Sequence, residues 1–114
     1  MLNVRDYSVL KNIIKHCLRV ESKTQNLTLE KFTNDLDVKE IICFNIFQIG
    51  ELSKQLTDSF VKQYNAMPWR DIKGMRDVIA HGYGTIDEET VWKTAINDIK
   101  PLHDYCEKII KENS

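Results

Sequence analysis

The sequence predicts an all-α protein, an up-and-down bundle of four to five helices in which residues 1–114 form a single domain. Apolar residues recur at spacings of three and four along most of the chain, which is the helical period. Only four glycines and two prolines interrupt it, too few for a fold of many short strands. A length of 114 residues suits one domain with one core.

The first helix is expected over residues 3–22, where six apolar side chains share one face: Val4, Tyr7, Leu10, Ile14, Cys17 and Leu18. The polar stretch that follows ends this helix. A short turn or helix is then expected over residues 27–34, because Thr28 is a suitable N-cap residue.

The longest helix is predicted over residues 37–64, since apolar residues continue at helical spacing from Val38 to Val61. Phe44 and Phe47 widen this apolar stripe beyond one face. A second buried surface would explain the excess, and a two-fold homodimer is the simplest way to form one.

A break is expected at Pro68, which disfavours helical geometry at the residue before it. The next helix is predicted over residues 71–80, ended by Gly82 and Gly84. The last helix should start after Asp87, a good N-cap, and Pro101 should kink or split it. Trp69 is expected in the core or an interface, although its place in a loop also allows stacking on RNA bases.

Composition limits the classes of function. The formal net charge is −1 and no block of lysine and arginine occurs, so composition gives no support for nucleic-acid binding. No apolar run reaches membrane-spanning length and no signal peptide is evident, so a cytoplasmic location is expected. The three cysteines form no CxxC pair and are interpreted as small buried hydrophobic residues.

The candidate catalytic residues are expected in the segment from Gly74 to Asp87. Arg76 and His81 are five residues apart, which places them about 140° apart around a straight helix. They would therefore need a distorted helix end, or a long reach by Arg76, to act together. An Arg and a His at a helix end can also serve only as a cap.

Cleavage of RNA needs no metal or other cofactor in principle, because the 2′-hydroxyl is a nucleophile beside the phosphate. Histidine titrates near neutral pH and can act as the base or the acid. The planar arginine side chain matches two phosphate oxygens at once.

The run from Arg76 to His81 resembles the HEPN signature, an Arg followed by a polar residue and, after four to six positions, a His. Its extension through Gly82 and Tyr83 to Asp87 is similar to the HepT-like (DUF86) subgroup. Further likenesses lie along the chain: Ile49-Gly50-Glu51, Pro68-Trp69, Gly74-Met75 and Val91-Trp92. The resemblance implies a HEPN bundle that dimerises so that two Arg/His sets face one cleft.

The resemblance also implies roles for individual residues. Arg76 and His81 match the pair that cleaves RNA without a metal, and Asp77 matches the polar position after the arginine. Tyr83 matches the tyrosine to which a partner nucleotidyltransferase, the MntA-type antitoxin, adds AMP to silence the toxin. Glu51 is a candidate to hold Arg76 in place. The RNA substrate, whether tRNA or messenger, is left open.

Two other functions fit the sequence. The chain could be a non-catalytic helical adaptor that binds and regulates a nucleotidyltransferase, which suits the nearly neutral charge. It could also be a nucleotide-binding module that uses Arg76 for a phosphate. His16 and His103 have no catalytic neighbours in the sequence and are expected to have packing or surface roles.

Overall fold

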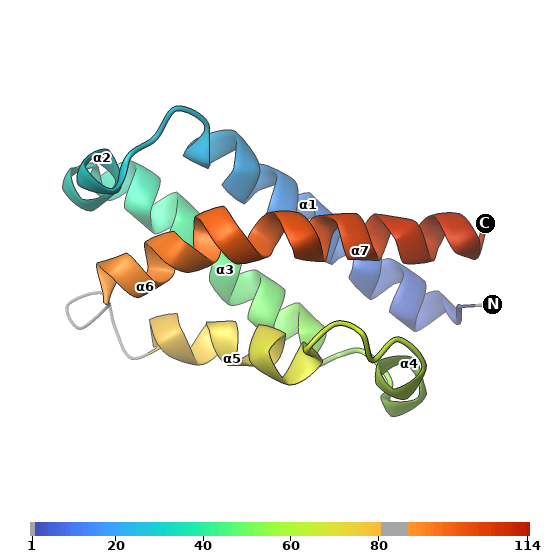
Figure 1. Ribbon diagram of the computed structural model, residues 1–114. Helices are drawn as coiled ribbons and strands as arrows, with labels where there is room; N and C mark the ends of the chain where they lie inside the picture. The colour runs from blue at the N-terminus through green and yellow to red at the C-terminus, as the bar shows by residue number, and fades with distance from the viewer. Residues whose placement is uncertain (1, 81–86) are drawn as a thin grey trace.

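The computed structural model describes residues 2–80 and 87–114, and within these ranges every regular element is a helix (Figure 1). Four long helices make the bundle: α1 (Val4–Thr24), α3 (Leu36–Ser53), α5 (Trp69–Ala80) and α7 (Ile99–Glu112). Helix α3 packs against both α1 and α5, and α7 packs on α1. The prediction of an all-α fold is confirmed for the described residues.

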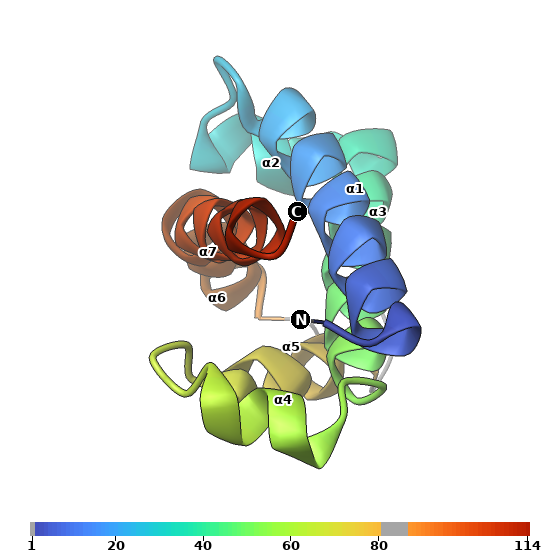
Figure 2. The same ribbon diagram turned by 90° about the vertical axis from the view of Figure 1, so that its right-hand side faces the viewer.

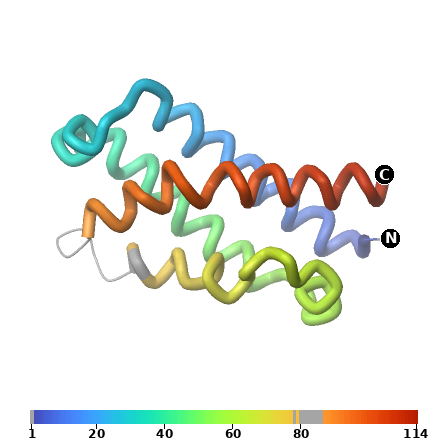
Figure 3. The backbone as a smooth tube through the Cα atoms, in the orientation of Figure 1, coloured from blue at the N-terminus to red at the C-terminus, as the bar shows by residue number. Residues whose placement is uncertain are grey.

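Viewed from the end, α1 and α3 lie side by side and α7 faces them, with α4 and α5 along a further edge (Figure 2). In the view of Figure 3, the tube of α7 crosses those of α1 and α3. The innermost side chains come from these three helices and are completely buried: Leu10, Ile13, Ile42, Ile49, Ile99 and Leu102. Burying each contributes about 1.5–3 kcal/mol to folding.

The first two helices begin at side-chain caps, of which the sequence predicts the second, Thr28. Asn3 caps α1 by accepting a hydrogen bond from the Asp6 amide at 2.7 Å. Thr28 caps the short helix α2 (Leu29–Asn34) by accepting from the Lys31 amide at 3.2 Å. Each cap satisfies an amide that has no partner within the helix.

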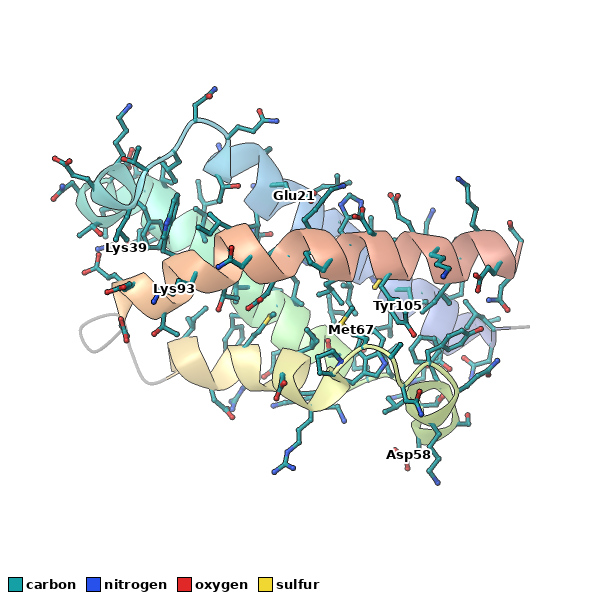
Figure 4. All side chains as sticks on the ribbon, viewed as in Figure 1. Glu21, Lys39, Asp58, Met67, Lys93 and Tyr105 are labelled. Atoms are coloured by element: carbon teal, nitrogen blue, oxygen red, sulfur yellow. The ribbon has the colours of Figure 1, made fainter. Side chains whose placement is uncertain are left out.

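One lysine ties three helices together at the end of the bundle that carries α2 and α6. Lys39 of α3 (Figure 4) donates to the Thr33 carbonyl of α2 and pairs with Glu88 of α6, both at 3.2 Å. Its side chain is 21% exposed, so the contact is partly shielded from water.

The prediction of one helix over residues 37–64 is wrong. The chain leaves helical geometry after Ser53, and a separate helix α4 (Asp58–Gln63) begins with Thr57 as its N-cap. Asp6 of α1, only 3% exposed, accepts hydrogen bonds from the Thr57 amide at 2.9 Å and the Thr57 hydroxyl at 2.7 Å. The break gives this buried carboxylate its partners, which burial requires.

Helix α5 begins two residues earlier than predicted, directly after Pro68. The Pro68 carbonyl accepts from the Ile72 amide at 3.1 Å, so the proline stands at the helix start, where its missing amide donor costs little. Trp69 is 2% exposed and its indole N–H donates to the Tyr64 carbonyl at 2.8 Å. It is therefore a core residue, and its buried ring is not presented for stacking on RNA.

The last helix is divided, in agreement with the prediction for Pro101. Helix α6 (Glu88–Lys93) is capped by Asp87, which accepts from the Thr90 amide at 3.2 Å. A π-helical turn (Thr94–Asp98) then joins it to α7. The wide turn lies directly before the position where proline removes an amide donor and crowds the preceding turn.

All three cysteines are free and buried, which confirms their interpretation as small hydrophobic residues. Burial raises the pKa of the Cys43 thiol to about 11 and that of Cys106 to about 12, and it raises the pKa of Cys17 further. Within the described ranges, no helix is both long and apolar enough to cross a membrane.

Candidate functional site

The candidate site lies where α5 crosses α3. A Cβ atom added to Gly50 of α3 would lie 2.7 Å from the backbone nitrogen of Arg76 and 2.9 Å from its Cβ. No larger residue fits such a distance unless a backbone moves. Gly50 therefore allows the close approach that brings Arg76 of α5 beside the next residue of α3, Glu51.

Arg76 is held by contacts from both helices. Its Nε, which is buried, forms an ion pair with the Glu51 carboxylate, and the side chain as a whole is 38% exposed. The guanidinium carbon lies 5.8 Å from the centre of the Phe47 ring, a cation–π arrangement. Its Nη1 lies 3.4 Å from the Asp77 carboxylate.

These contacts fix the direction of Arg76 more than they stabilise the fold. Glu51 is 35% exposed and also pairs with Lys54 at 3.3 Å. Partly exposed ion pairs contribute about 1 kcal/mol or less to stability. Because Glu51 contacts Nε, the Nη edge is the part of the planar group suited to an incoming phosphate.

The structure brings together three of the five site residues that the sequence predicts. Arg76, Glu51 and Asp77 form one cluster, and Asp77 is 69% exposed beside Arg76. His81 and Tyr83 lie outside the described residues, so their geometry, and any orientation of His81 by Asp77, stays a prediction. The same holds for Gly82 and Gly84 as the end of α5.

An open groove of about 880 Å³ runs beside α5, between it and the start of α7. Three cations and three carboxylates line it: Lys54, Arg70, Lys73, Asp71, Asp77 and Asp98. Opposite charges thus balance along its walls. The groove has room for a polar chain but no marked preference for anions.

The two other histidines have packing partners, as predicted. The His16 ring lies 2.7 Å, through Nδ1, from the side-chain oxygen of Asn45, whose amide nitrogen donates to the Ile41 carbonyl. His103 is 6% exposed, between Glu21 of α1 (Figure 4) at 2.8 Å and Glu107 at 2.9 Å. In the part of the chain that the structure describes, no group of three or more His, Cys, Asp or Glu residues is arranged to hold a metal.

Two residues of the site were not assigned a role in it from the sequence. The sequence pattern groups Phe47 with the excess apolar surface, yet in the structure its ring lies 5.8 Å from the Arg76 guanidinium carbon. Gly50 appeared only within a motif, yet it controls the distance between the helices. A glycine in the middle of a long helix was the available signal, because glycine there is unfavourable unless close packing needs it.

The comparisons with known proteins identify the family of the chain. The family model described as "Ribonuclease HepT-like" matches residues 13–109, a range that contains all the predicted site residues. "Probable ribonuclease HepT" of Thermococcus cleftensis is 31% identical over 107 residues, covering 94% of this chain and 96% of that protein. "Putative RNase MJ1216" of Methanocaldococcus jannaschii is 31% identical over 103 residues, covering 90% of this chain and 85% of that protein.

The described residues form an all-α fold, and the family model and the relatives define the class as ribonuclease-like. The chain belongs to the HepT-like ribonuclease family. No solved structure matches it.

Proposed function

We propose that this protein is a metal-independent endoribonuclease, the toxin of a HepT/MntA-type toxin–antitoxin pair. Arg76 binds the scissile phosphate of RNA, and His81 moves the proton of the 2′-hydroxyl or of the leaving 5′-oxygen. Asp77 and Glu51 position these two groups. The family model and the names of the relatives support the ribonuclease part of this proposal.

The single observation that carries the proposal is the orientation of Arg76. A guanidinium that stabilises a phosphorane must be held in place before the reaction, since reorganisation would lower the rate. Glu51 holds Nε and Phe47 lies under the planar group. Arg76 thus keeps a fixed direction while 38% of its side chain stays exposed.

His81 follows Arg76 by five residues in the sequence. The attacking 2′-hydroxyl must lose a proton, and the departing 5′-oxygen must gain one. A histidine can supply either transfer near neutral pH. No metal is needed to create the nucleophile, because the RNA itself carries it.

Silencing of the toxin would act at Tyr83. A partner nucleotidyltransferase of the MntA type would transfer AMP from ATP to the Tyr83 hydroxyl and release pyrophosphate. Each AMP adds bulk and a negative phosphate two residues from His81, where anionic RNA would have to bind. Intact mass after incubation with such an enzyme and ATP, beside Tyr83→Phe, tests this step.

The proposed active form is a two-fold homodimer in which two Arg/His sets face one cleft. Phe44 on α3 is 53% exposed, and Phe47 one turn further on is partly buried beneath Arg76. A homodimer interface on this face of α3 would cover the exposed Phe44 ring. Light scattering should give a dimer mass, reduced by Phe44→Glu.

The main test is RNA cleavage by purified protein in the presence of excess chelator, with tRNA and messenger RNA as substrates. Arg76→Ala and His81→Ala should each lower the rate at least about a hundredfold. Arg19→Ala, at an exposed arginine of α1, is the matched control and should stay near wild type. Equal rates in all four folded proteins would contradict the assignment.

A second function, a non-catalytic adaptor for a nucleotidyltransferase, is favoured by one observation. Two carboxylates, those of Glu51 and Asp77, already lie against Arg76 and partly neutralise it. An adaptor would use this cluster only to position a partner. Intact RNA across neutral pH, together with tight binding to the transferase, would support the adaptor.

A further inference from the structure

A second groove, of about 720 Å³, lies between α1 and α7, away from the helix crossing that holds Arg76. We call it the α1–α7 groove. Its walls are formed by Lys11, Ile14, Lys15 and Leu18 of α1 and by Lys108, Ile110 and Lys111 of α7, together with Asp104 and Glu107. Neither the family match nor the proposed cleavage assigns it a role.

Each wall repeats with the period of a helix. The α1 residues 11, 14, 15 and 18 stand at i, i+3, i+4 and i+7, as do the α7 residues 104, 107, 108 and 111. Residues at these spacings share one helix face. The groove is thus a trough at least about 10 Å long between two neighbouring helices.

The charge of the groove is positive although the chain carries a formal charge of −1. The two carboxylate side chains of its lining have other partners, since Asp104 pairs with Lys100 and Glu107 with His103, both at 2.9 Å. Within the described ranges, none of the four lysines lies at ion-pair distance from a carboxylate. Lysines without such partners attract anionic groups.

The floor of the groove is aliphatic. Leu18 is 50% exposed, and Ile14 and Ile110 are partly buried against the core. Single-stranded RNA is commonly bound by base stacking on aromatic rings; the groove lining contains none, and the Tyr7 ring, 5.9 Å from the Lys11 ammonium, lies outside that lining. An aliphatic floor between lysines suits a ligand with aliphatic side chains flanked by carboxylates.

We propose that the α1–α7 groove is a docking site for an acidic amphipathic helix of a protein partner. The partner helix lies in the groove and packs against both α1 and α7, in the helix-in-groove mode. Its leucine-type side chains cover Leu18 and Ile14, and its glutamates or aspartates face Lys15 and Lys111. This interaction is independent of the proposed cleavage at Arg76.

The test uses a labelled helical peptide of about 15 residues, with leucines on one face and glutamates beside them. An isomer with lysines in place of the glutamates is the peptide control. In fluorescence anisotropy at low salt, the acidic peptide should bind the full chain and the basic isomer should not. Affinity should fall as the salt concentration rises, because salt screens exposed charges.

Variants of both walls locate the binding. Lys15→Glu on α1 and Lys111→Glu on α7 should each weaken the acidic peptide about fivefold or more. Leu18→Asn should weaken it by a similar factor through loss of apolar contact, about fivefold. Lys62→Glu makes the same charge change at an exposed lysine of α4 and should leave binding within about twofold.

Four results would overturn the proposal. The two peptides could bind equally, or Lys15→Glu and Lys111→Glu could behave like Lys62→Glu. A non-cleavable 2′-O-methyl RNA could bind through these lysines while the acidic peptide does not, which would make the groove an RNA track. The lysine variants could change the mass of the protein in solution, which would make it an interface between two copies of this chain.

Discussion

The backbone nitrogen of Arg76 lies only 2.7 Å from the point where a Cβ atom on Gly50 would be. Two helices that are far apart in the sequence touch at this point, and the residue after Gly50 is the one that pairs with Arg76. Because glycine has no Cβ atom, Gly50 lets α5 approach α3 closely, and this approach sets the position of the Arg76 guanidinium. This relationship gives the first prediction.

Gly50→Ala should destabilise the protein by about 1–3 kcal/mol, because the added methyl group meets the α5 backbone and not a flexible side chain. It should also lower RNA cleavage, since α5 must move and carry Arg76 with it. Urea denaturation and a cleavage assay measure the two effects.

Gly74→Ala is the matched control, since a Cβ atom there meets nothing within 4 Å. Alanine is the better helix former, so this variant should gain about 0.5–1 kcal/mol. If the two alanine variants were equally stable, the close helix crossing would be wrong.

A second prediction concerns the break between α3 and α4. Thr57→Val should cost about 1–3 kcal/mol, because the change removes both the cap of α4 and a hydrogen bond to buried Asp6. Thr57→Ser keeps the hydroxyl and should stay within about 0.5 kcal/mol of wild type. Thermal unfolding of the three proteins measures the difference, and equal losses in both variants would argue against the Asp6 contact.

A third prediction concerns pH. Burial holds the pKa of Cys43 at about 11 and that of Cys106 at about 12, against 9.0 for a free thiol. Below pH 9 the thiols keep their protons in both the folded and the unfolded state, so their effect on stability is constant. Above pH 9 the unfolded chain releases protons first, so the free energy of unfolding falls as pH rises, by at most about 1.4 kcal/mol per pH unit per thiol.

Urea denaturation at a series of pH values from 7 to 10.5 measures this fall. The double variant Cys43→Ala/Cys106→Ala should be less stable at every pH, because both side chains leave cavities. Its stability should fall less steeply above pH 9 than that of wild type. Parallel curves for the two proteins would show that these thiols do not titrate as their burial requires.

Local signals in the sequence predicted most of the helices. The caps at Thr28 and Asp87 and the effect of Pro101 depend on residues within one or two turns, and each is found in the structure. The break after Ser53 was missed because it depends on Asp6, which is 51 residues away from its partner Thr57. The apolar stripe continues through the break, so periodicity alone could not show it.

In the candidate site, too, the sequence predicts individual residues but not the contacts that depend on how the helices pack. The sequence predicts Arg76, Asp77 and Glu51 as site residues. The structure contains the predicted contact between Glu51 and Arg76, and Asp77 also lies beside Arg76. The support from Phe47 and the partner that approaches Gly50 depend on how α3 and α5 cross; the mid-helix glycine signals a close approach but does not identify Arg76 as the partner. The catalytic roles of Arg76 and His81 stay predictions.

The central claim is that Glu51 acts through Arg76 to hold it for a phosphate. The most direct measurement is single-turnover RNA cleavage by wild type, Glu51→Ala, Arg76→Ala and the double variant, all shown to be folded. Arg76→Ala should lose at least about a hundredfold in rate, Glu51→Ala should lose less, and the double variant should be no slower than Arg76→Ala. Additive losses, or an Arg76→Ala protein as fast as wild type, would contradict the account.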